Sequence, residues 1–243
     1  MELRSKTEQM KKILPKILPA ILILSCFNFQ SFSQVTNQRV FDTVGFIPEH
    51  YPVRIALFEK ESFSTGGIIF LGNSITEMGD WKKLTGDSTA VNRGIGGDIT
   101  FGVLKRLDEI IRRQPRKLFI LIGINDIGKD IPDAVIADNV RKIIERVQQE
   151  SSKTTIYIHS ILPVNPLVPN FPQHYDKQTQ ILSTNIKLKE IADSKNVVFI
   201  NIHDQFLDEQ QNLDKRYTVD GLHLNKSGYD MWIKYLRDNL FLP

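Results

Sequence analysis

Short apolar runs alternate with longer amphipathic stretches from residue 66 onward. Each run is mostly apolar without a two-residue alternation, which is typical of strands buried on both faces. Five runs are candidate strands: residues 67–71, 90–92, 118–122, 154–159 and 197–200. The run at 90–92 is the shortest and weakest of them.

Between these runs, apolar residues recur at helical spacing, which predicts helices there. After Pro132, five residues fall on one helical face: Ile136, Val140, Ile143, Ile144 and Val147. Further helices are expected around 104–111, over 179–192 and after Asn225, which can cap a last helix carrying Trp232 and Leu236. Such alternation of strand and helix predicts an α/β fold, a parallel sheet with helices on both faces.

The chain divides into three parts on this reading. Residues 66–243 form the α/β domain. Residues 34–65 lack a clear strand and are expected to be an N-terminal extension, with a short helix near 53–62 that packs on the same domain. Residues 1–33 carry five basic and two acidic side chains, which accounts for the whole net charge of +3.

The N-terminal part has the pattern of a secretory signal peptide. Lys11, Lys12 and Lys16 precede an apolar run at residues 17–29, and small residues follow, with cleavage expected after Ser33. The run is too short to span a bilayer, so no transmembrane span is expected after cleavage. The protein is therefore predicted to be exported, periplasmic or secreted. Cys26 leaves open a lipoprotein anchor as an alternative.

The amino-acid composition excludes several kinds of site and partner. The chain has 243 residues, is 41% hydrophobic and 24% charged, and contains one Cys. One Cys excludes an intramolecular disulfide and a zinc site built on several cysteines. Outside residues 1–33, basic and acidic side chains balance at 26 each. A neutral body gives no electrostatic reason to expect a nucleic-acid partner.

Polar or glycine-rich turns follow four of the expected elements. In open α/β sheets, functional groups gather at the carboxyl ends of the strands. The four blocks are residues 72–76 (Gly-Asn-Ser-Ile-Thr), 92–98 (Asn-Arg-Gly-Ile-Gly-Gly-Asp), 123–126 (Gly-Ile-Asn-Asp) and 220–223 (Asp-Gly-Leu-His). We expect them to meet at one edge of the sheet.

These blocks contain the parts that a serine nucleophile needs. Ser74 lies on a strand-to-helix turn, and among the five histidines only His223 has a carboxylate, Asp220, three residues earlier. The Gly96–Gly97 turn and the Asn125 amide are candidate donors to an oxyanion.

Plainer roles compete with these chemical ones. Ser74 could only cap the helix that follows it, and Asp98 is expected to be a helix N-cap rather than a catalytic acid. Asn125 could be a buried turn residue. Asp220 and His223 could ligate a metal with His203. No third carboxylate or His lies at a recognisable ligand spacing from Asp220 and His223, so we expect no metal. Trp81 and Trp232 are most simply core residues.

The four blocks, in this order, resemble those of the SGNH hydrolases, also called GDSL-type esterases. Within that family they are most similar to the branch of platelet-activating-factor acetylhydrolase and bacterial carbohydrate O-acetylesterases. The resemblance covers about residues 66–240. It implies a three-layer α/β/α sandwich, flavodoxin-like, with a five-stranded parallel sheet and no cofactor.

The resemblance also assigns roles. It implies Ser74 as nucleophile, His223 as base and Asp220 as its orienter, with oxyanion donors from the Ser74 and Gly97 backbone and the Asn125 side chain. Asn73 departs from the family, because many relatives have Asp there; we expect altered local hydrogen bonding rather than lost activity.

The resulting hypothesis is an esterase that removes a small acyl group, acetyl in the first instance, from a glycan or other small-molecule ester. A lysophospholipase or thioesterase-type acyl hydrolase is the enzymatic alternative. A non-catalytic glycan-binding protein on the same scaffold is the alternative from another class. Phosphate or flavin binding by the glycine-rich turn fits the fold but lacks a P-loop Gly-Lys-Ser/Thr element. The oligomeric state is left open.

Overall fold

The computed structural model describes residues 44–168 and 170–243. The predicted signal peptide, with Cys26, lies outside the described residues, and so do residues 34–43 of the predicted extension. The domain from residue 44 onward is described below by itself.

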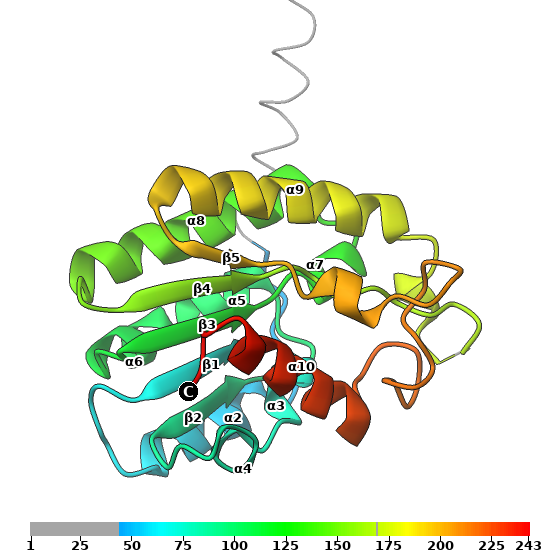
Figure 1. Ribbon diagram of the computed structural model, residues 1–243. Coiled ribbons are helices and arrows are strands. Elements are labelled where there is room, and N and C mark those ends of the chain that lie inside the picture. Colours follow the sequence, from blue (N-terminus) through cyan, green and yellow to red (C-terminus); the bar gives the residue numbers. More distant parts are fainter. Residues whose placement is uncertain (1–43, 169) are drawn as a thin grey trace, which may run out of the picture. The chain divides into compact units, whose positions relative to one another are not determined.

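Five parallel strands form a single sheet (Figure 1). They are β1 (Ile68–Gly72), β2 (Ala90–Gly94), β3 (Lys117–Leu121), β4 (Thr155–His159) and β5 (Val198–Ile200). Their order across the sheet is β2-β1-β3-β4-β5, so the chain starts near one edge, steps outward once, and then crosses to the other side. In register, Ile69 of β1 lies between Val91 of β2 and Leu118 of β3.

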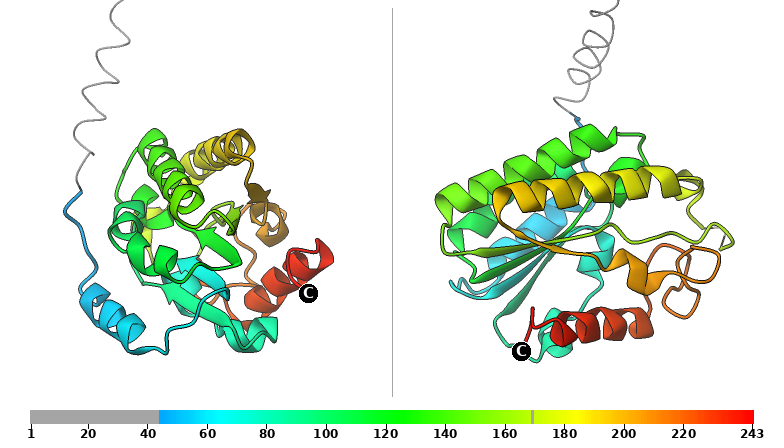
Figure 2. Two further views of the ribbon diagram at one scale, coloured as in Figure 1. Left: turned by 90° about the vertical axis from the view of Figure 1, so that its left-hand side faces the viewer. Right: turned by 45° about the horizontal axis from the view of Figure 1, so that its top comes forward.

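Helices cover both faces of the sheet (Figures 1 and 2). One face is covered by α5 (Thr100–Lys105), α6 (Leu107–Arg112), α8 (Asp133–Glu150) and α9 (Gln178–Lys195). The other face is covered by α4 (Trp81–Thr85) and α10 (Lys226–Asp238). Right-handed crossovers require this arrangement, because the connection from β1 to β2 runs opposite in direction to the later ones. The predicted three-layer α/β/α sandwich is confirmed.

Successive residues of each strand point to opposite faces of the sheet, and so pack into two separate apolar layers. In β1, Ile69 and Leu71 point into the layer under α5 and α8, whereas Ile68 and Phe70 point into the layer under α4 and α10. All are almost fully buried, which explains the continuous apolar run in the sequence. Burial of each such side chain stabilises the fold by about 1.5–3 kcal/mol.

Trp81 and Trp232 are both core residues, as expected. They lie in the layer under α4 and α10, with 2% and 0% of their surfaces exposed, and meet edge to face at 4.9 Å. The Trp81 ring also stacks on Phe70. Trp232 Nε1–H donates to Nε2 of the buried His159 at 3.1 Å, and this burial lowers the pKa of His159 to about 3. His159 is thus a neutral core side chain.

Two helical regions differ from the expected pattern. The helix expected around 104–111 is two helices, α5 and α6, which meet at Arg106. Arg106 turns inward to pair with Asp98, a tertiary contact that apolar spacing does not report. The helix expected near 53–62 is α2, Tyr51–Lys60, and it begins earlier because Pro52 suits a first helical turn.

The helix expected after Ser74 is α3 (Ser74–Glu77), a single short turn. Three further short helices lie where the pattern predicted only turns or loops: α7 (Ile124–Ile127) and the 3-10 helices η1 (Pro172–His174) and η2 (His203–Phe206). Across the described ranges, 44–168 and 170–243, no helix has the length and apolar character needed to cross a membrane.

Candidate active site

Ser74 lies at the junction of β1 and α3, where the strand ends and the helix begins. It is the first residue of α3, with its surface partly exposed. The N-cap of α3 is Asn73, whose Oδ1 accepts a hydrogen bond from the Ile75 N–H at 3.0 Å. Asn73, and not Ser74, is therefore the N-cap of this helix. The alternative in which Ser74 serves only as a cap does not hold, and the Ser74 hydroxyl is available for another contact.

That contact is with His223, which is 149 residues further along the chain. Nε2 of His223 lies 2.9 Å from Oγ of Ser74. Nδ1 of the same ring lies 2.7 Å from Oδ2 of Asp220. The structure thus brings together the three residues that the sequence singled out, in the order hydroxyl, imidazole, carboxylate that a serine nucleophile with its base requires.

The Asp220 carboxylate is held by its own turn. Its Oδ1 accepts the backbone N–H groups of Leu222 at 3.0 Å and His223 at 2.7 Å. Gly221 supplies the left-handed conformation of the turn, with φ of 84°. Burial alone would raise the pKa of Asp220, but these bonds and the His223 ring outweigh it, and the pKa is lowered. Asp220 is therefore a carboxylate at neutral pH.

The glycine-rich turn after β2 offers one backbone N–H to a ligand. Gly94 N–H donates to Asn92 Oδ1, Ile95 N–H to the Gly72 carbonyl, Gly96 N–H to the Glu77 carboxylate and Asp98 N–H to the Ile95 carbonyl. Gly97, with φ of 74°, is the exception: within the described part of the chain its N–H has no acceptor. That is the state expected of a donor reserved for a ligand.

Ser74 and Asn125 supply further donors. The Ser74 backbone N–H likewise has no acceptor among residues 44–168 and 170–243. Asn125 follows β3, and its Nδ2 donates one hydrogen to the Asp98 carbonyl at 3.0 Å, at the turn that carries Gly97. This bond fixes the amide, and its second hydrogen remains for another acceptor.

The loop that contains Phe171, which carries none of the predicted site residues, contacts His223. The Phe171 ring meets the His223 ring nearly edge to face, at 5.2 Å between centroids. The loop is tied to the Asp220 turn, because Asn165 N–H donates to the Gly221 carbonyl at 2.8 Å. No pattern in the sequence marks Phe171, since the contact depends on how the loop folds back.

A small cavity lies against the same strand ends. Its volume is about 10 Å³, close to the space that one water molecule needs. Asn73 and Ile75, which flank Ser74, and Leu222, which precedes His223, are among its lining residues. The remaining lining residues are apolar: Leu121, Ile122, Ile124, Ile161, Leu162 and Pro163.

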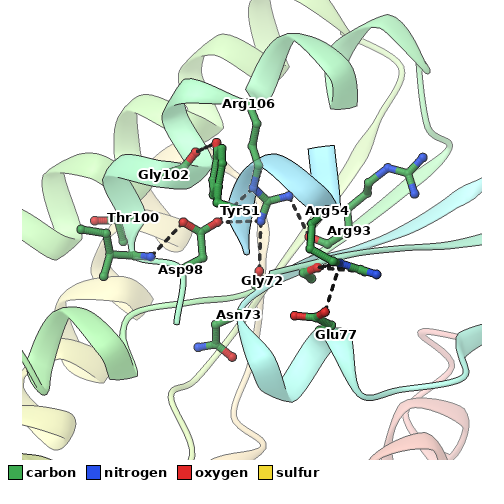
Figure 3. Close-up of polar contacts among 12 residues, drawn as sticks. Tyr51, Arg54, Gly72, Asn73, Glu77, Arg93, Asp98, Thr100, Gly102 and Arg106 are labelled. Carbon is green, nitrogen blue, oxygen red and sulfur yellow. Dashed lines mark hydrogen bonds and ion pairs between the residues drawn. The ribbon is translucent and has the colours of Figure 1, made fainter. Parts of the chain in front are cut away.

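Two of the plainer roles are changed by the structure. Asp98 is not the N-cap of α5, which is Ile99; its carboxylate is buried and pairs with Arg106, whose Nη2 lies 2.9 Å away (Figure 3). That pairing needs Arg106 to enter from the far end of α5, which local sequence cannot show. His203, the third residue of the metal alternative, bonds instead to Asp204 at 3.2 Å. In the described residues, no three His, Cys, Asp or Glu side chains gather closely enough to hold a metal ion.

The class of the protein follows from comparison with known families. Residues 70–231 match the model of the GDSL-like lipase/acylhydrolase family. The chain belongs to this family, and the resemblance noted in its four blocks is confirmed. The protein is accordingly a carboxylic ester hydrolase, an acylhydrolase of the GDSL type.

Individual relatives are more distant. The chain is 25% identical over 177 residues to platelet-activating factor acetylhydrolase IB subunit alpha2 of Rattus norvegicus, covering 70% of this chain and 74% of the relative. It is 29% identical over 182 residues to N-acylneuraminate cytidylyltransferase of Escherichia coli, covering 72% of this chain but only 41% of that protein. The latter's named activity therefore does not transfer.

Solved structures share the fold. A candidate platelet activating factor from Streptococcus pneumonia is 32% identical, with a TM-score of 0.70, covering 86% of this chain and 98% of that one. An acetylxylan esterase from Geobacillus stearothermophilus is 17% identical, with a TM-score of 0.59, covering 73% of this chain and 95% of that one. At that identity, the second likeness shows the fold alone.

Proposed function

We propose that Ser74 is the nucleophile of the esterase reaction, with His223 as general base and Asp220 as the residue that orients the imidazole. His223 Nε2 takes the Ser74 proton as Oγ attacks the ester carbonyl, forming a tetrahedral intermediate. The intermediate collapses, the C–O bond to the alcohol breaks, and His223 returns the proton to the leaving alkoxide. Water, activated by the same base, then hydrolyses the acyl-serine.

The negative oxygen of the intermediate would be bound by three donors: the Ser74 and Gly97 backbone N–H groups and the Asn125 amide. Among the described residues neither backbone N–H has an acceptor, and the Asn125 amide is held by the Asp98 carbonyl; both observations support this assignment. Donors arranged before the reaction stabilise developing charge without a reorganisation cost, and each contributes about 10²–10³ in rate.

The acyl group is proposed to be small, in the first instance acetyl, and the alcohol a carbohydrate. The Phe171 ring supports a small acyl group, because it takes up space beside His223 that a long acyl chain would need. The named activity of the rat acetylhydrolase points the same way. A predicted signal peptide would place the enzyme outside the cytoplasm, where glycans are accessible.

The 2.9 Å contact between Ser74 Oγ and His223 Nε2 carries the mechanistic proposal. Its test is hydrolysis of p-nitrophenyl acetate by the wild type and by Ser74→Ala. We expect kcat to fall about 10⁴- to 10⁶-fold in the variant. Ser183→Ala, a serine on α9 whose hydroxyl bonds to Asp133, is a matched control and should retain activity. Comparable rates in Ser74→Ala and the control would refute the proposal.

The substrate is tested separately. Rates on p-nitrophenyl acetate, butyrate and octanoate should fall with chain length, and acetate should be released from an acetylated polysaccharide such as acetylxylan. A preference for octanoate would favour the lysophospholipase or thioesterase-type alternative. Binding of the glycan without acetate release would favour the non-catalytic one.

A further inference from the structure

The turn that carries Gly97 is held from outside the region that matches the family model. The match to the family begins at residue 70, yet side chains from residues 48–54 contact this turn. These residues belong to the start of α2 and the segment before it. Two of them, His50 and Arg54, contact the carboxylate of Glu77, which lies on the same short helix as Ser74.

Glu77 joins the nucleophile's helix to the glycine-rich turn. Its Oε2 accepts the backbone N–H of Gly96, the residue directly before Gly97. The backbone of α3 ties Glu77 to the nucleophile elbow, because Glu77 N–H donates to the Asn73 carbonyl at 2.9 Å. The direction of the Gly97 N–H depends on the orientation of the peptide that Gly96 and Gly97 share. A fixed Gly96 therefore restricts where the Gly97 donor points.

Arg54 and His50 hold this carboxylate in place. Arg54 Nε lies 3.1 Å from Glu77 Oε1, and its Nη2 donates to the Gly94 carbonyl at 3.1 Å (Figure 3). His50 Nε2 lies 3.3 Å from Glu77 Oε2. Only 24% of the Glu77 side chain and 21% of the Arg54 side chain are exposed, so this ion pair is less screened by solvent than a surface pair.

The same segment leaves the turn little room to move. A Cβ added to Gly96 would lie 3.1 Å from the His50 ring, and one added to Gly97 would lie 3.4 Å from Pro48. Tyr51, at the start of α2, donates its hydroxyl to the Gly102 carbonyl at 2.9 Å, which anchors the segment to α5 behind the turn (Figure 3). The segment thus packs on the turn as well as bonding to it.

We propose that Arg54, acting through Glu77, is a positioning residue for the Gly97 oxyanion donor, and that residues 48–54 are part of the active-site machinery rather than a passive extension. The inference rests on the proposed function, because it concerns the donor used in that reaction. Arg54 does not touch the substrate; it sets the geometry of a group that does. Such a residue should affect the transition state more than the bound substrate.

The test compares Arg54→Ala with Arg116→Ala. Arg116 is a matched control, because it also pairs with one carboxylate, that of Asp87, and bonds to one backbone carbonyl, that of Gly66, but it directly precedes β3, at the amino end of the strand. For Arg54→Ala we expect kcat on p-nitrophenyl acetate to fall about 10- to 100-fold, with KM changed less than about twofold. For Arg116→Ala we expect neither constant to change more than about twofold.

A second readout separates positioning from general damage. A boronic acid becomes tetrahedral on binding to serine and so mimics the intermediate; its Ki should rise in Arg54→Ala in parallel with the fall in kcat/KM. Arg54→Lys, which restores the charge, should recover part of kcat. The melting temperatures of Arg54→Ala and Arg116→Ala report whether either variant is unfolded.

Glu77→Gln provides an independent variant. It keeps an oxygen for the Gly96 N–H but removes the charge that holds Arg54, and we expect kcat to fall with KM unchanged. In the double variant with Arg54→Ala, the loss should be smaller than the product of the two single losses, since both act on the same turn. Independent losses, or values of kcat equal to the Arg116 control, would overturn the inference. An active wild type with an inactive Ser74→Ala would then leave the proposed function standing.

Discussion

The two edges of the sheet, at the amino and carboxyl ends of the strands, differ in how their polar groups are hydrogen-bonded. At the amino edge, polar groups satisfy one another: Arg116 bonds to Gly66 and Thr89 and pairs with Asp87. Close by, the Thr154 hydroxyl donates to the Pro115 carbonyl at 2.6 Å. At the carboxyl edge, Ser74 and Gly97 each keep a backbone N–H that has no acceptor in the described residues.

This difference shows where the molecule departs from what folding alone requires. A polar group that is buried without a partner costs about 1–3 kcal/mol, so folded proteins usually pair such groups. Ser74 and Gly97 are partly exposed, which lets water satisfy their donors until a ligand arrives. Among the described residues, the backbone donors without an acceptor at one edge and the paired groups named above at the other separate the site from the scaffold without reference to any motif.

After Ser74→Ala, the largest expected effect at the carboxyl edge comes from Asp220→Asn. The amide cannot accept and hold the His223 Nδ1–H as the carboxylate does, so the imidazole loses its orientation and the stabilisation of its charged form. We expect kcat on p-nitrophenyl acetate to fall about 10³- to 10⁴-fold. Steady-state kinetics with a circular dichroism control measure this; a loss below about tenfold would mean that Asp220 does not support the base.

Asn125→Ala should have the next largest effect. It removes the bond to the Asp98 carbonyl and one of the three donors proposed for the oxyanion, and we expect kcat to fall about 10²- to 10³-fold with little change in KM. Asn139→Ala is a useful comparison, because Asn139 also donates its amide within this region, to the Thr100 hydroxyl at 2.9 Å, but is buried behind the site. Equal losses of kcat in the two variants would argue for a structural role of Asn125.

Asp126→Asn should change the pH dependence of the free energy of unfolding rather than the rate of catalysis. Burial raises the pKa of Asp126 from 3.8 to about 7, although hydrogen bonds from Thr100 lower it in part. The folded state therefore favours the protonated form, and this contribution to stability is full below about pH 4 and is lost as the pH rises through 7. Relative to Asp126→Asn, the wild type should lose a few kcal/mol of unfolding free energy between pH 4 and 8. Urea denaturation at several pH values measures this, and parallel curves would contradict it.

Arg116→Ala should have the smallest effect. Its ion pair with Asp87 is partly exposed, and such pairs contribute about 0–1 kcal/mol. We expect a drop in unfolding free energy of that size in urea titrations, with esterase activity unchanged. Loss of activity in this variant would show that the two edges are not as separate as the contrast above implies.

The fold was largely predictable because its signals are local. Continuous apolar runs marked β1, β3 and β4, and Asn225 was expected to cap the last helix; its Oδ1 accepts the Gly228 N–H at 3.0 Å. The break between α5 and α6 was not predictable, since it depends on Arg106 reaching Asp98, Arg93 and Gly72. Nothing in the spacing of apolar residues reports a buried ion pair.

The candidate site divides in the same way. Ser74, Asp220 and His223 could be selected because each lies in a turn after a strand or beside its partner in sequence. Phe171, Glu77 and Arg54 could not, because their contacts join segments far apart in the chain and use residue types that are common on any surface. The residues proposed to react could therefore be predicted from the sequence, whereas the residues that hold them in position could not.

The assignment of Ser74 as the nucleophile is tested most directly by covalent labelling with a fluorophosphonate ester, followed by mass spectrometry of the digested protein. We expect one label per molecule, carried by the peptide that contains Ser74, with loss of esterase activity in proportion to labelling. Ser74→Ala should take up no label. Labelling of another residue, or an unlabelled Ser74 in a fully inactivated enzyme, would contradict this assignment.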